Sequence, residues 1–414
     1  MVDHINDEEG PSFVIGNIAR GIDMWDRDAE IDEIWKTLKN DNVLLKACRR
    51  FGKSSIMLKM KENPRHDFIC FMFDAESTKS PEDFVVTLLD KLRAENELNG
   101  DANLKKLLKK AIRIIKKSFN AIDQVGISEF SLKFRDAISS DWRKVAVELI
   151  DYLSGFNRKI LFIIDELPQL ILNMKQHHDN NVACEFLNWF REVRQSHNLS
   201  NIRWLFGGSI GIEHAIKKVG AQNTVINDLS IIVLKPYSDK IGREFIAALL
   251  KQEGKFREIS SGIIEKIMNT VGSPVPYFLQ ILIKESLDTM NAAGEATLTN
   301  EIIEDAYHES VLGVAKRAYF EHFYDRLSDY YDNNEVEIVK QIIVETARKE
   351  GGISKADLSD LYKTIVGDKI PGTRINDIMA DLQNEFYIVY DHTIGTYRFL
   401  TNVLRDWWLR YHSD

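Results

Sequence analysis

The feature that most constrains the fold is a short apolar run, residues 43–45, followed closely by Gly52, Lys53 and Ser54. The phosphate-binding pattern G-x-x-x-x-G-K-S/T needs a strand before it and a helix after it, and the flanking residues predict both. In such a loop, backbone N–H groups and the helix N-terminus cradle phosphates. Lys53 would then neutralise the β and γ oxygens, and the Ser54 hydroxyl would hold Mg²⁺.

The first position of this loop departs from the pattern, because Ala47 stands where glycine is usual. Alanine is tolerated there provided that its φ is not forced positive, whereas Gly52 lets the backbone approach where a Cβ would collide. We therefore expect a working loop rather than a chance turn. Its expected nucleotide contacts are Ala47, Arg49, Arg50, Phe51, Gly52, Lys53, Ser54 and Ser55.

A second apolar strand, residues 159–164, ends in the carboxylates Asp165 and Glu166. We expect Asp165 to reach Mg²⁺ through a water, and Glu166 to polarise the attacking water as a general base. Two acidic residues at a strand end are weak evidence alone, since acidic residues often cap such turns. Together with a lysine loop far upstream, they predict a nucleotide hydrolase.

Two further segments fit the same site. The strand that starts near residue 202 ends in two glycines and Ser209, which could sense the γ-phosphate or position the lytic water; a plain glycine turn is the alternative. Pro274 and Pro276 fix the chain at a helix start, which is rigid enough to place backbone against a nucleotide base. On its own that segment predicts only a helix N-terminus.

The alternation of short apolar runs with helical patterns predicts an α/β fold with a parallel sheet. We expect strands at 42–46, 68–73, 159–164, 202–206 and 230–234 in a P-loop core spanning 1–236, with an insertion at about 98–140. An all-α lid subdomain is expected at 237–329. From 330 to 414, three helices and a β-hairpin follow the order of a winged-helix domain, after an acidic linker at 329–335.

Composition narrows the function classes. The chain has 414 residues, 44% apolar and 28% charged, and a net charge of −9, which argues against a surface that is basic throughout. The first residues are polar and acidic, and no run of about 18 apolar residues could span a bilayer, so we expect a cytosolic protein without a transmembrane segment. Three scattered cysteines indicate reduced thiols.

Taken in order, these motifs resemble the STAND and archaeal-ATPase branch of AAA+-related P-loop NTPases. The segments that carry the resemblance are MWDRDAEIDEIW, CRRFGKSS, LFIIDELP, FGGSIG, IIVLKPYS, GSPVPYFLQ and YRFLTNVLRDWW. The resemblance covers residues 21–408, and the ordered set is more specific than any single motif. It implies a P-loop core, a helical lid and a winged helix, with ATP and Mg²⁺ as cofactors; no acidic motif for guanine is present.

The same resemblance implies several site roles. Asp26 and Arg27 would lie near the adenine, and Gly272 with Pro274 would match a glycine-x-proline element that contacts nucleotide and relays its state to the winged helix. Assembly would be supported by an arginine finger from a neighbouring subunit. Arg191 and Arg194 are the candidates, with solvated helix arginines as the alternative. Ala47 departs from the glycine usual in the family.

Nucleic-acid binding is not favoured by the charges. The helix expected at 373–385 carries Arg374 against Asp377, Asp381 and Glu385, and an acidic recognition helix works against phosphate contacts. A basic amphipathic pattern at 104–117 could instead lie on anionic lipid, nucleic acid or an acidic partner, or pack its apolar face on the core. A small hairpin is expected at 125–134.

The function favoured by the sequence is an ATP-binding and hydrolysing switch that controls self-assembly or a partner protein. Regulation or antiviral defence is a setting implied by the resemblance alone. The first alternative is a DNA-associated ATPase, initiator-like or a transposition helper, that uses the winged helix and the basic insertion on duplex. The second is a nucleotide-binding scaffold without turnover.

Overall fold

A computed structural model describes residues 10–99, 135, 138, 141–155, 158–196, 201–209, 211–331, 333–367, 374–385 and 387–413. The chain forms two compact units, which we call the sheet unit and the helical unit. The sheet unit comprises Asp28–Ala47 and Lys53–Leu234. The helical unit comprises Met1–Arg27, Cys48–Gly52 and Lys235–Asp414.

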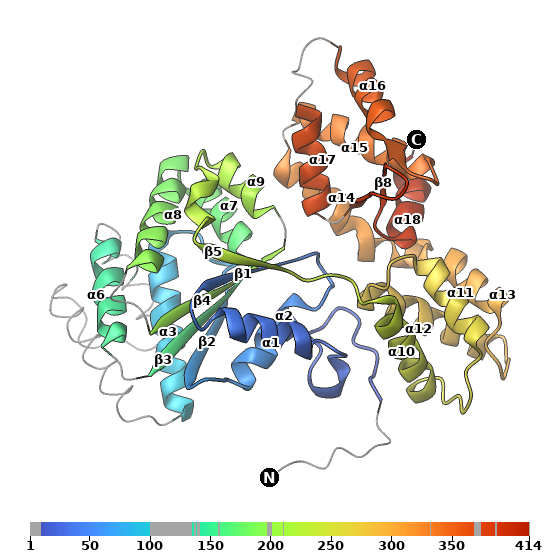
Figure 1. The fold of residues 1–414 in the computed structure, drawn as a ribbon, viewed down its shortest axis with the longest axis horizontal. Helices are drawn as coiled ribbons and strands as arrows, with labels where there is room; N and C mark the ends of the chain where they lie inside the picture. The colour runs from blue at the N-terminus through green and yellow to red at the C-terminus, as the bar shows by residue number, and fades with distance from the viewer. Residues whose placement is uncertain are drawn as a thin grey trace. The chain divides into compact units, whose positions relative to one another are not determined.

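The sheet unit is built on five parallel strands in the order β2-β3-β4-β1-β5 (Figure 1). All five strands expected from the sequence are present. Their bounds are β1 (Asn42–Ala47), β2 (Phe68–Asp74), β3 (Lys159–Asp165), β4 (Ile202–Ser209) and β5 (Leu229–Val233). A crossover order of this kind brings the carboxyl ends of the strands to one edge, where ligands bind in open α/β sheets.

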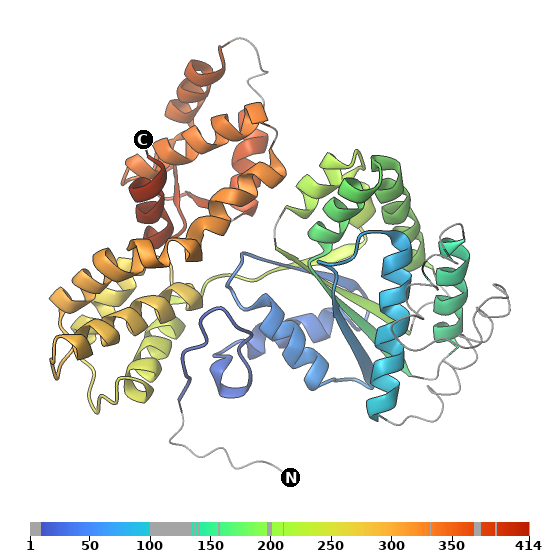
Figure 2. The ribbon, with the colours of Figure 1, turned by 180° about the vertical axis from the view of Figure 1, so that it is seen from behind.

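Helices cover both faces of the sheet (Figure 2), which explains why β3 is apolar on both sides. One face carries a cluster rich in aromatic residues, including Phe162 and Trp204, that packs on α3, α6, α7, α8 and α9. On the other face α1 lies against β1, and α2 crosses β1, β2, β3 and β4. The helices are α1 (Asp28–Thr37), α2 (Lys53–Glu62), α3 (Pro81–Asn99), α6 (Trp142–Ser154), α7 (Leu167–His177), α8 (Asn180–Gln195), α9 (Ile212–Lys218) and η3 (Asn223–Ile226).

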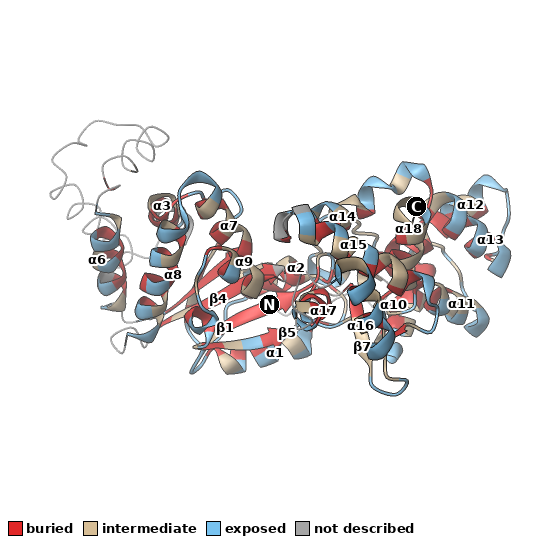
Figure 3. Ribbon diagram, turned by 90° about the horizontal axis from the view of Figure 1, so that it is seen from above, coloured by how far each residue is buried: buried red, intermediate tan, exposed pale blue. Residues whose placement is uncertain are grey.

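The first part of the helical unit is entirely helical after residue 235, as expected. Its elements are α10 (Asp239–Gln252), α11 (Ser261–Val271), α12 (Pro276–Ala292), α13 (Asn300–Asp305), the π-helical turn η4 (Ala306–Val311), η5 (Val314–Lys316) and α14 (Ala318–Tyr330); η1 (Gly21–Asp23) precedes the sheet. Of these, α12 is buried along most of its length, including Leu279 and Ile283, both fully buried (Figure 3).

The last part of the helical unit has its elements in the expected order. They are α15 (Asn333–Arg348), β6 (Ile353–Ser354), α16 (Lys355–Val366), α17 (Arg374–Asn384), β7 (Ile388–Asp391), β8 (Thr396–Phe399) and α18 (Asn402–His412). The hairpin is joined by β6 into an antiparallel sheet, β6-β8-β7. Ser354 caps α16 by accepting a hydrogen bond from the Asp357 amide. The expected linker is largely helix ends, and Tyr331 within it is buried.

Several expectations are left untested. The basic pattern at 104–117 and the hairpin at 125–134 lie outside the described residues. The domain boundaries expected near 236 and 330 stay predictions. Among the described helices, none combines the length and the apolar character needed to cross a bilayer.

Candidate functional site

At the carboxyl edge of the sheet, the structure brings together the lysine and the carboxylates expected to act on nucleotide. Lys53 opens α2 and Asp165 closes β3. The Lys53 ammonium forms an ion pair with Asp165 Oδ1, and Glu166 Oε1 lies 3.2 Å from the same nitrogen. The side chains of Lys53 and Asp165 are 6% and 8% exposed. A lysine and two carboxylates from segments far apart in the sequence therefore meet at one point.

Asp165 is held by more than the lysine. Ser54 Oγ donates to Asp165 Oδ2 at 2.6 Å, and the Glu166 amide donates to Oδ1 at 2.9 Å. Burial alone would raise the pKa of Asp165, but the charge and hydrogen bond of Lys53, with the bonds from Ser54 and the Glu166 amide, hold that pKa below its usual value. Asp165 is therefore an ionised carboxylate at neutral pH.

These oxygens suit a magnesium ion. Mg²⁺ prefers hard oxygen ligands and is commonly bound through one or two carboxylates, waters and the phosphates of its substrate. The Ser54 hydroxyl and the Asp165 carboxylate converge within hydrogen-bond distance, and they are the groups that would hold the ion. When bound, the ion would neutralise charge on phosphate oxygens. Among the described residues, no group of three or more His, Cys, Asp or Glu forms a protein-only metal site.

Gly207 is a site residue that the sequence reasoning missed, since it was treated only as part of a glycine turn. A Cβ built on Gly207 would lie 2.3 Å from Asp165 Oδ1 and 2.9 Å from Met57 Cε. Because Lys53, Ser54 and the Glu166 amide hold the Asp165 carboxylate in place, glycine is needed for β4 to pass beside it. A glycine inside a strand often marks such a close approach, and this signal was available in the sequence.

Ser209 ends β4, and its backbone lies beside the start of the loop. The parallel register pairs Ala47 with Ser209 and Lys46 with Gly208. The end of β4 and the root of the phosphate-binding loop are therefore neighbours, as a sensing role for this segment requires. The role of the Ser209 side chain stays a prediction.

The loop itself meets the condition set for alanine at its first position. Ala47 is fully buried and is absent from the described residues that have a positive φ. The left-handed positions are instead Arg50 (φ 73°) and Gly52 (φ 93°). Apart from its chain neighbours, no atom of the described residues lies within 4 Å of a Cβ built on Gly52, so its conformation, rather than crowding, is what favours glycine. Non-glycine residues in this region are strained, which is common at functional sites.

Residues Cys48–Gly52 belong to the helical unit, and Arg27 is the main support of this turn. The Arg27 guanidinium donates to the Phe51 carbonyl at 3.3 Å and to the Lys235 carbonyl at 3.2 Å. It also stacks 4.5 Å above the ring of Tyr237, and Arg27 is 3% exposed. The guanidinium of Arg27 thus supports the loop backbone. Its neighbour Asp26 has a positive φ of 39°.

Charged residues of the C-terminal helices also surround this turn, and sequence reasoning did not place them there. Burial and the charge of Glu385 raise the pKa of the Cys48 thiol to about 12. Burial and then the charges of Arg49, Arg50 and Arg326 lower the pKa of His322 to about 3. Arg50 in addition lies 4.9 Å from the ring centre of Tyr277. No sequence signal would have found these long-range neighbours.

The Gly272–Pro274 segment connects several parts of the helical unit. Gly272 ends α11 with a φ of 83°, and a Cβ on it would lie 3.1 Å from Asn402. Ser273 Oγ donates to the Leu400 carbonyl at 2.5 Å, and the Tyr237 amide donates to the Pro274 carbonyl at 3.1 Å. The segment therefore contacts the chain between β8 and α18, as well as the residue on which Arg27 stacks.

Arg194 lies where it would have difficulty reaching a second subunit. Its guanidinium makes two bonds of 2.9 Å to Asp228 and one of 2.6 Å to the Val225 carbonyl, and the side chain is 2% exposed. This placement favours a structural role for Arg194 over the arginine finger. Arg191, on the same helix, is half-buried, and its Nε has no hydrogen-bond partner in the described part of the chain.

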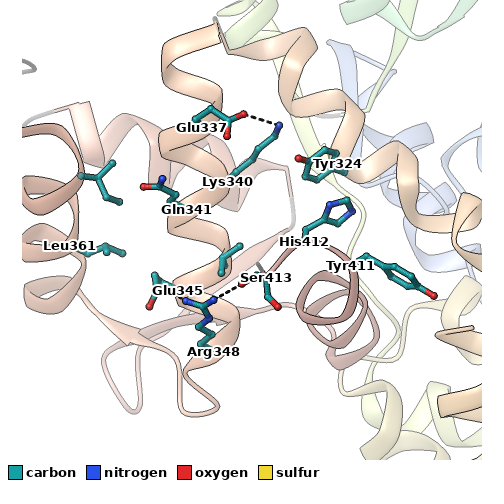
Figure 4. A pocket seen from close by; sticks show the side chains of 12 residues that line it. Tyr324, Glu337, Lys340, Gln341, Glu345, Arg348, Leu361, Tyr411, His412 and Ser413 are labelled. Carbon is teal, nitrogen blue, oxygen red and sulfur yellow. Dashed lines mark hydrogen bonds and ion pairs between the residues drawn. The ribbon is translucent and has the colours of Figure 1, made fainter. Parts of the chain in front are cut away.

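A hollow of about 550 Å³ lies in the helical unit between α14, α15, α16 and α18 (Figure 4). None of the site residues described above lines it. Its two cations are already engaged. Lys340 pairs with Glu337 at 3.0 Å and lies over the ring of Tyr324, and Arg348 donates to the Ser413 carbonyl. The hollow is therefore a poorer candidate for a phosphate site than the loop at Lys53.

Comparison with solved structures supports a P-loop NTPase architecture. A Walker-type ATPase of Pyrococcus abyssi superposes with a TM-score of 0.61, covering 94% of this chain and 97% of that chain at 17% sequence identity. The chain has a P-loop NTPase fold. This likeness, at such low identity, establishes the fold and not the activity.

Two other structures are less similar to this P-loop NTPase fold. The ORC2 protein of Aeropyrum pernix covers 96% of this chain and 97% of its own, with a TM-score of 0.49 and 11% identity. Cdc6p of Pyrobaculum aerophilum covers 97% and 96%, with a TM-score of 0.44 and 11% identity. Both scores lie below 0.5, so these two add nothing to the assignment. No family model matches the sequence, and no curated protein matches it.

Proposed function

We propose that this chain is a Mg²⁺-dependent ATPase of the AAA+-related class, and that it uses the state of its nucleotide as a switch. The observation that carries the proposal is the buried cluster of Lys53, Ser54, Asp165 and Glu166 at the carboxyl edge of a P-loop sheet. Phosphoryl transfer is catalysed mainly by positioning and electrostatic stabilisation, and these are the groups that it requires.

Each residue has a distinct role in the proposed reaction. Lys53 exchanges its carboxylate partners for the β and γ phosphate oxygens. Ser54 and Asp165 would hold the ion, Asp165 through a water, and Glu166 would accept a proton from the attacking water. Glu166 adopts a left-handed backbone conformation, with φ 59°, directly after β3. Strain of this kind supports a catalytic rather than a packing role for Glu166.

Base recognition is proposed for Asp26 and Arg27, together with Gly272 and Pro274. The Arg27 guanidinium is occupied by two carbonyl groups and the Tyr237 ring, so the backbone beside it is the part left for a base. Pro274 is linked to the same Tyr237 through its carbonyl. These links support placing the nucleotide close to the loop turn.

The switch role is supported by the surroundings of the loop turn. Residues Cys48–Gly52 pack within the helical unit, near His322, Arg326 and Glu385, rather than within the unit that carries Asp165. A nucleotide that reshapes this turn would change the contacts of α14 and α17. A bistable element biased by phosphate contacts is a recurrent switching device.

We propose that the last part of the chain is a winged helix that contacts protein rather than DNA. Arg374 at the start of α17 pairs with Glu335 at 2.8 Å and with Asp377 at 3.5 Å, so its charge is neutralised within the chain. A protein partner or a second copy of this chain fits such a surface better than duplex. A DNA-associated ATPase stays the second candidate, since the basic pattern at 104–117 lies outside the described residues.

The test is the rate of ATP hydrolysis by the purified protein over a range of its own concentration, with Mg²⁺ and with Lys53→Ala as the blank. We expect a Mg²⁺-dependent rate that Lys53→Ala abolishes. A specific activity that rises with protein concentration would indicate self-assembly, and a constant one a monomer. Nucleotide binding without any turnover in the wild type would instead identify a scaffold, whose behaviour Glu166→Gln should leave unchanged.

A further inference from the structure

A partly buried ion pair, to which the proposed mechanism assigns no role, joins two segments next to the proposed site. Lys46 is the penultimate residue of β1, directly before the phosphate-binding loop. Its ammonium is hydrogen-bonded to Glu213 Oε1 on α9. The two side chains are 10% and 22% exposed, so the pair is partly buried.

The ion pair joins the end of β1, from which the phosphate-binding loop starts, to the chain that follows β4. The register places Lys46 beside Gly208 and Ala47 beside Ser209. After β4 the chain turns at Gly211, which has a φ of 87°, and α9 begins at Ile212, one residue before Glu213. The pair therefore joins the end of β1, and with it the adjacent end of β4, to the first turn of α9.

Few other bonds hold these two charges in place. Glu213 Oε2 is buried and accepts no hydrogen bond from the described residues, so the carboxylate is held through Oε1. The backbone of Lys46 is itself fixed, since its carbonyl accepts from the Leu234 amide at 2.8 Å. A buried charge that loses its partner is strongly destabilised. The position of Glu213 thus depends on Lys46, which sits on a rigid strand.

We propose that Lys46 and Glu213 are positioning residues of the ATPase, and that their ion pair holds the start of α9 to the end of β1 and so sets the position of the end of β4. This inference rests on the proposed function. In this role the pair acts through the backbone at the end of β4, which includes Ser209, and not on the nucleotide itself. Small misplacements of a positioning segment cost rate, because the reacting groups must be aligned to within about 1 Å.

The experiment compares Glu213→Gln and Lys46→Met with the charge-swapped double variant Lys46→Glu/Glu213→Lys. For each, kcat and KM for ATP are measured, together with amide hydrogen exchange of residues 208–213 in the nucleotide-free protein. The control is Glu185→Gln, which breaks the exposed pair of Arg143 and Glu185, whose side chains are 48% and 63% exposed.

We expect each single variant to lower kcat on the order of tenfold with little change in KM, and to speed exchange at 208–213. The swapped variant should recover part of both, and Glu185→Gln should match the wild type. If kcat of the single variants stays within about twofold of wild type, the inference is wrong. An equal loss of kcat, ATP affinity and thermal stability would also overturn it, because it would indicate a purely structural pair.

A fourth variant keeps the test decisive if the single variants fail to fold. Replacing a buried ion pair with apolar residues is often tolerated, so Lys46→Met/Glu213→Leu should fold. It lacks the directional bond, and we expect its kcat to remain low; full activity would refute the positioning role. If the wild type does not hydrolyse ATP, the proposed function fails. The exchange rates at 208–213 still decide whether the ion pair orders this segment.

Discussion

The two halves of the phosphate-binding loop are held in different ways. From Lys53 onward the chain belongs to the sheet unit, where buried charges and short hydrogen bonds fix Lys53, Ser54 and Asp165. Residues Cys48–Gly52 belong to the helical unit, where Arg27 binds a backbone carbonyl and Arg50 lies over a ring. The chemical groups thus rest on regular elements, which hold geometry best. The turn depends on residues outside the sheet.

The comparison predicts that variants of the part from Lys53 onward, in the sheet unit, change the rate of ATP hydrolysis. Variants that disturb the turn at Cys48–Gly52 should change the affinity for ATP. Glu166→Gln is the sharpest test of the part in the sheet unit. Losing the general base should lower turnover by roughly 10²- to 10⁴-fold while ATP still binds. Steady-state hydrolysis and nucleotide titration would measure the two separately. Glu185→Gln serves as the surface control, and an unchanged rate would remove Glu166 from the mechanism.

Gly207→Ala tests how closely the sheet half is packed. The added methyl would meet Asp165 Oδ1 at 2.3 Å, so we expect a loss of about 1–3 kcal/mol in the free energy of unfolding and weaker Mg²⁺-dependent binding of ATP. Gly208→Ala is the matched control, because its nearest neighbour, Pro168, lies at an ordinary 3.5 Å. Urea denaturation of both variants gives the difference. Equal stabilities would show that β4 can shift away from Asp165.

Arg27→Lys tests the turn at Cys48–Gly52, which belongs to the helical unit. A lysine keeps the charge, but its ammonium lacks the fixed fork geometry with which Arg27 binds two carbonyl groups, and it cannot stack on the Tyr237 ring as a planar guanidinium does. We expect the dissociation constant for ATP to rise about 5- to 30-fold, equivalent to losing about 1–2 kcal/mol of support for the turn. At saturating ATP, kcat should stay close to wild type. Arg143→Lys, at an exposed position, is the control. A fall in kcat alone would contradict the division between the halves.

His322 offers a smaller, pH-dependent test of the turn's surroundings. Burial and the nearby arginines lower its pKa from 6.5 to about 3, so the folded state refuses a proton that the unfolded state accepts. The folded protein is therefore destabilised as pH falls from about 6.5 towards about 3. Relative to wild type, His322→Gln should lose about 1 kcal/mol less stability between roughly pH 6.5 and 5. Parallel pH profiles from denaturant titrations would show that His322 is not buried among these charges.

Much of this architecture could be predicted from local pattern. The five strands, α2 after the loop and the order of helices and hairpin at the C-terminus follow from the periodicity of apolar residues, because burial on one or both faces is written into each segment. The same holds for Lys53, Ser54, Asp165 and Glu166. Their positions at strand and helix ends predicted that they would lie together, because a parallel sheet must bring its carboxyl ends to one edge.

The sequence by itself therefore determined the class of fold and named the residues that meet at the candidate site. Only the tertiary structure decided which distant residues hold them: Gly207 beside Asp165, Arg27 on the Phe51 carbonyl, Glu213 on Lys46, and Arg194 paired with Asp228 instead of free. The reason is physical. Periodicity reports which face of an element is buried, whereas the partner of a buried charge or glycine depends on how elements far apart in the chain pack together.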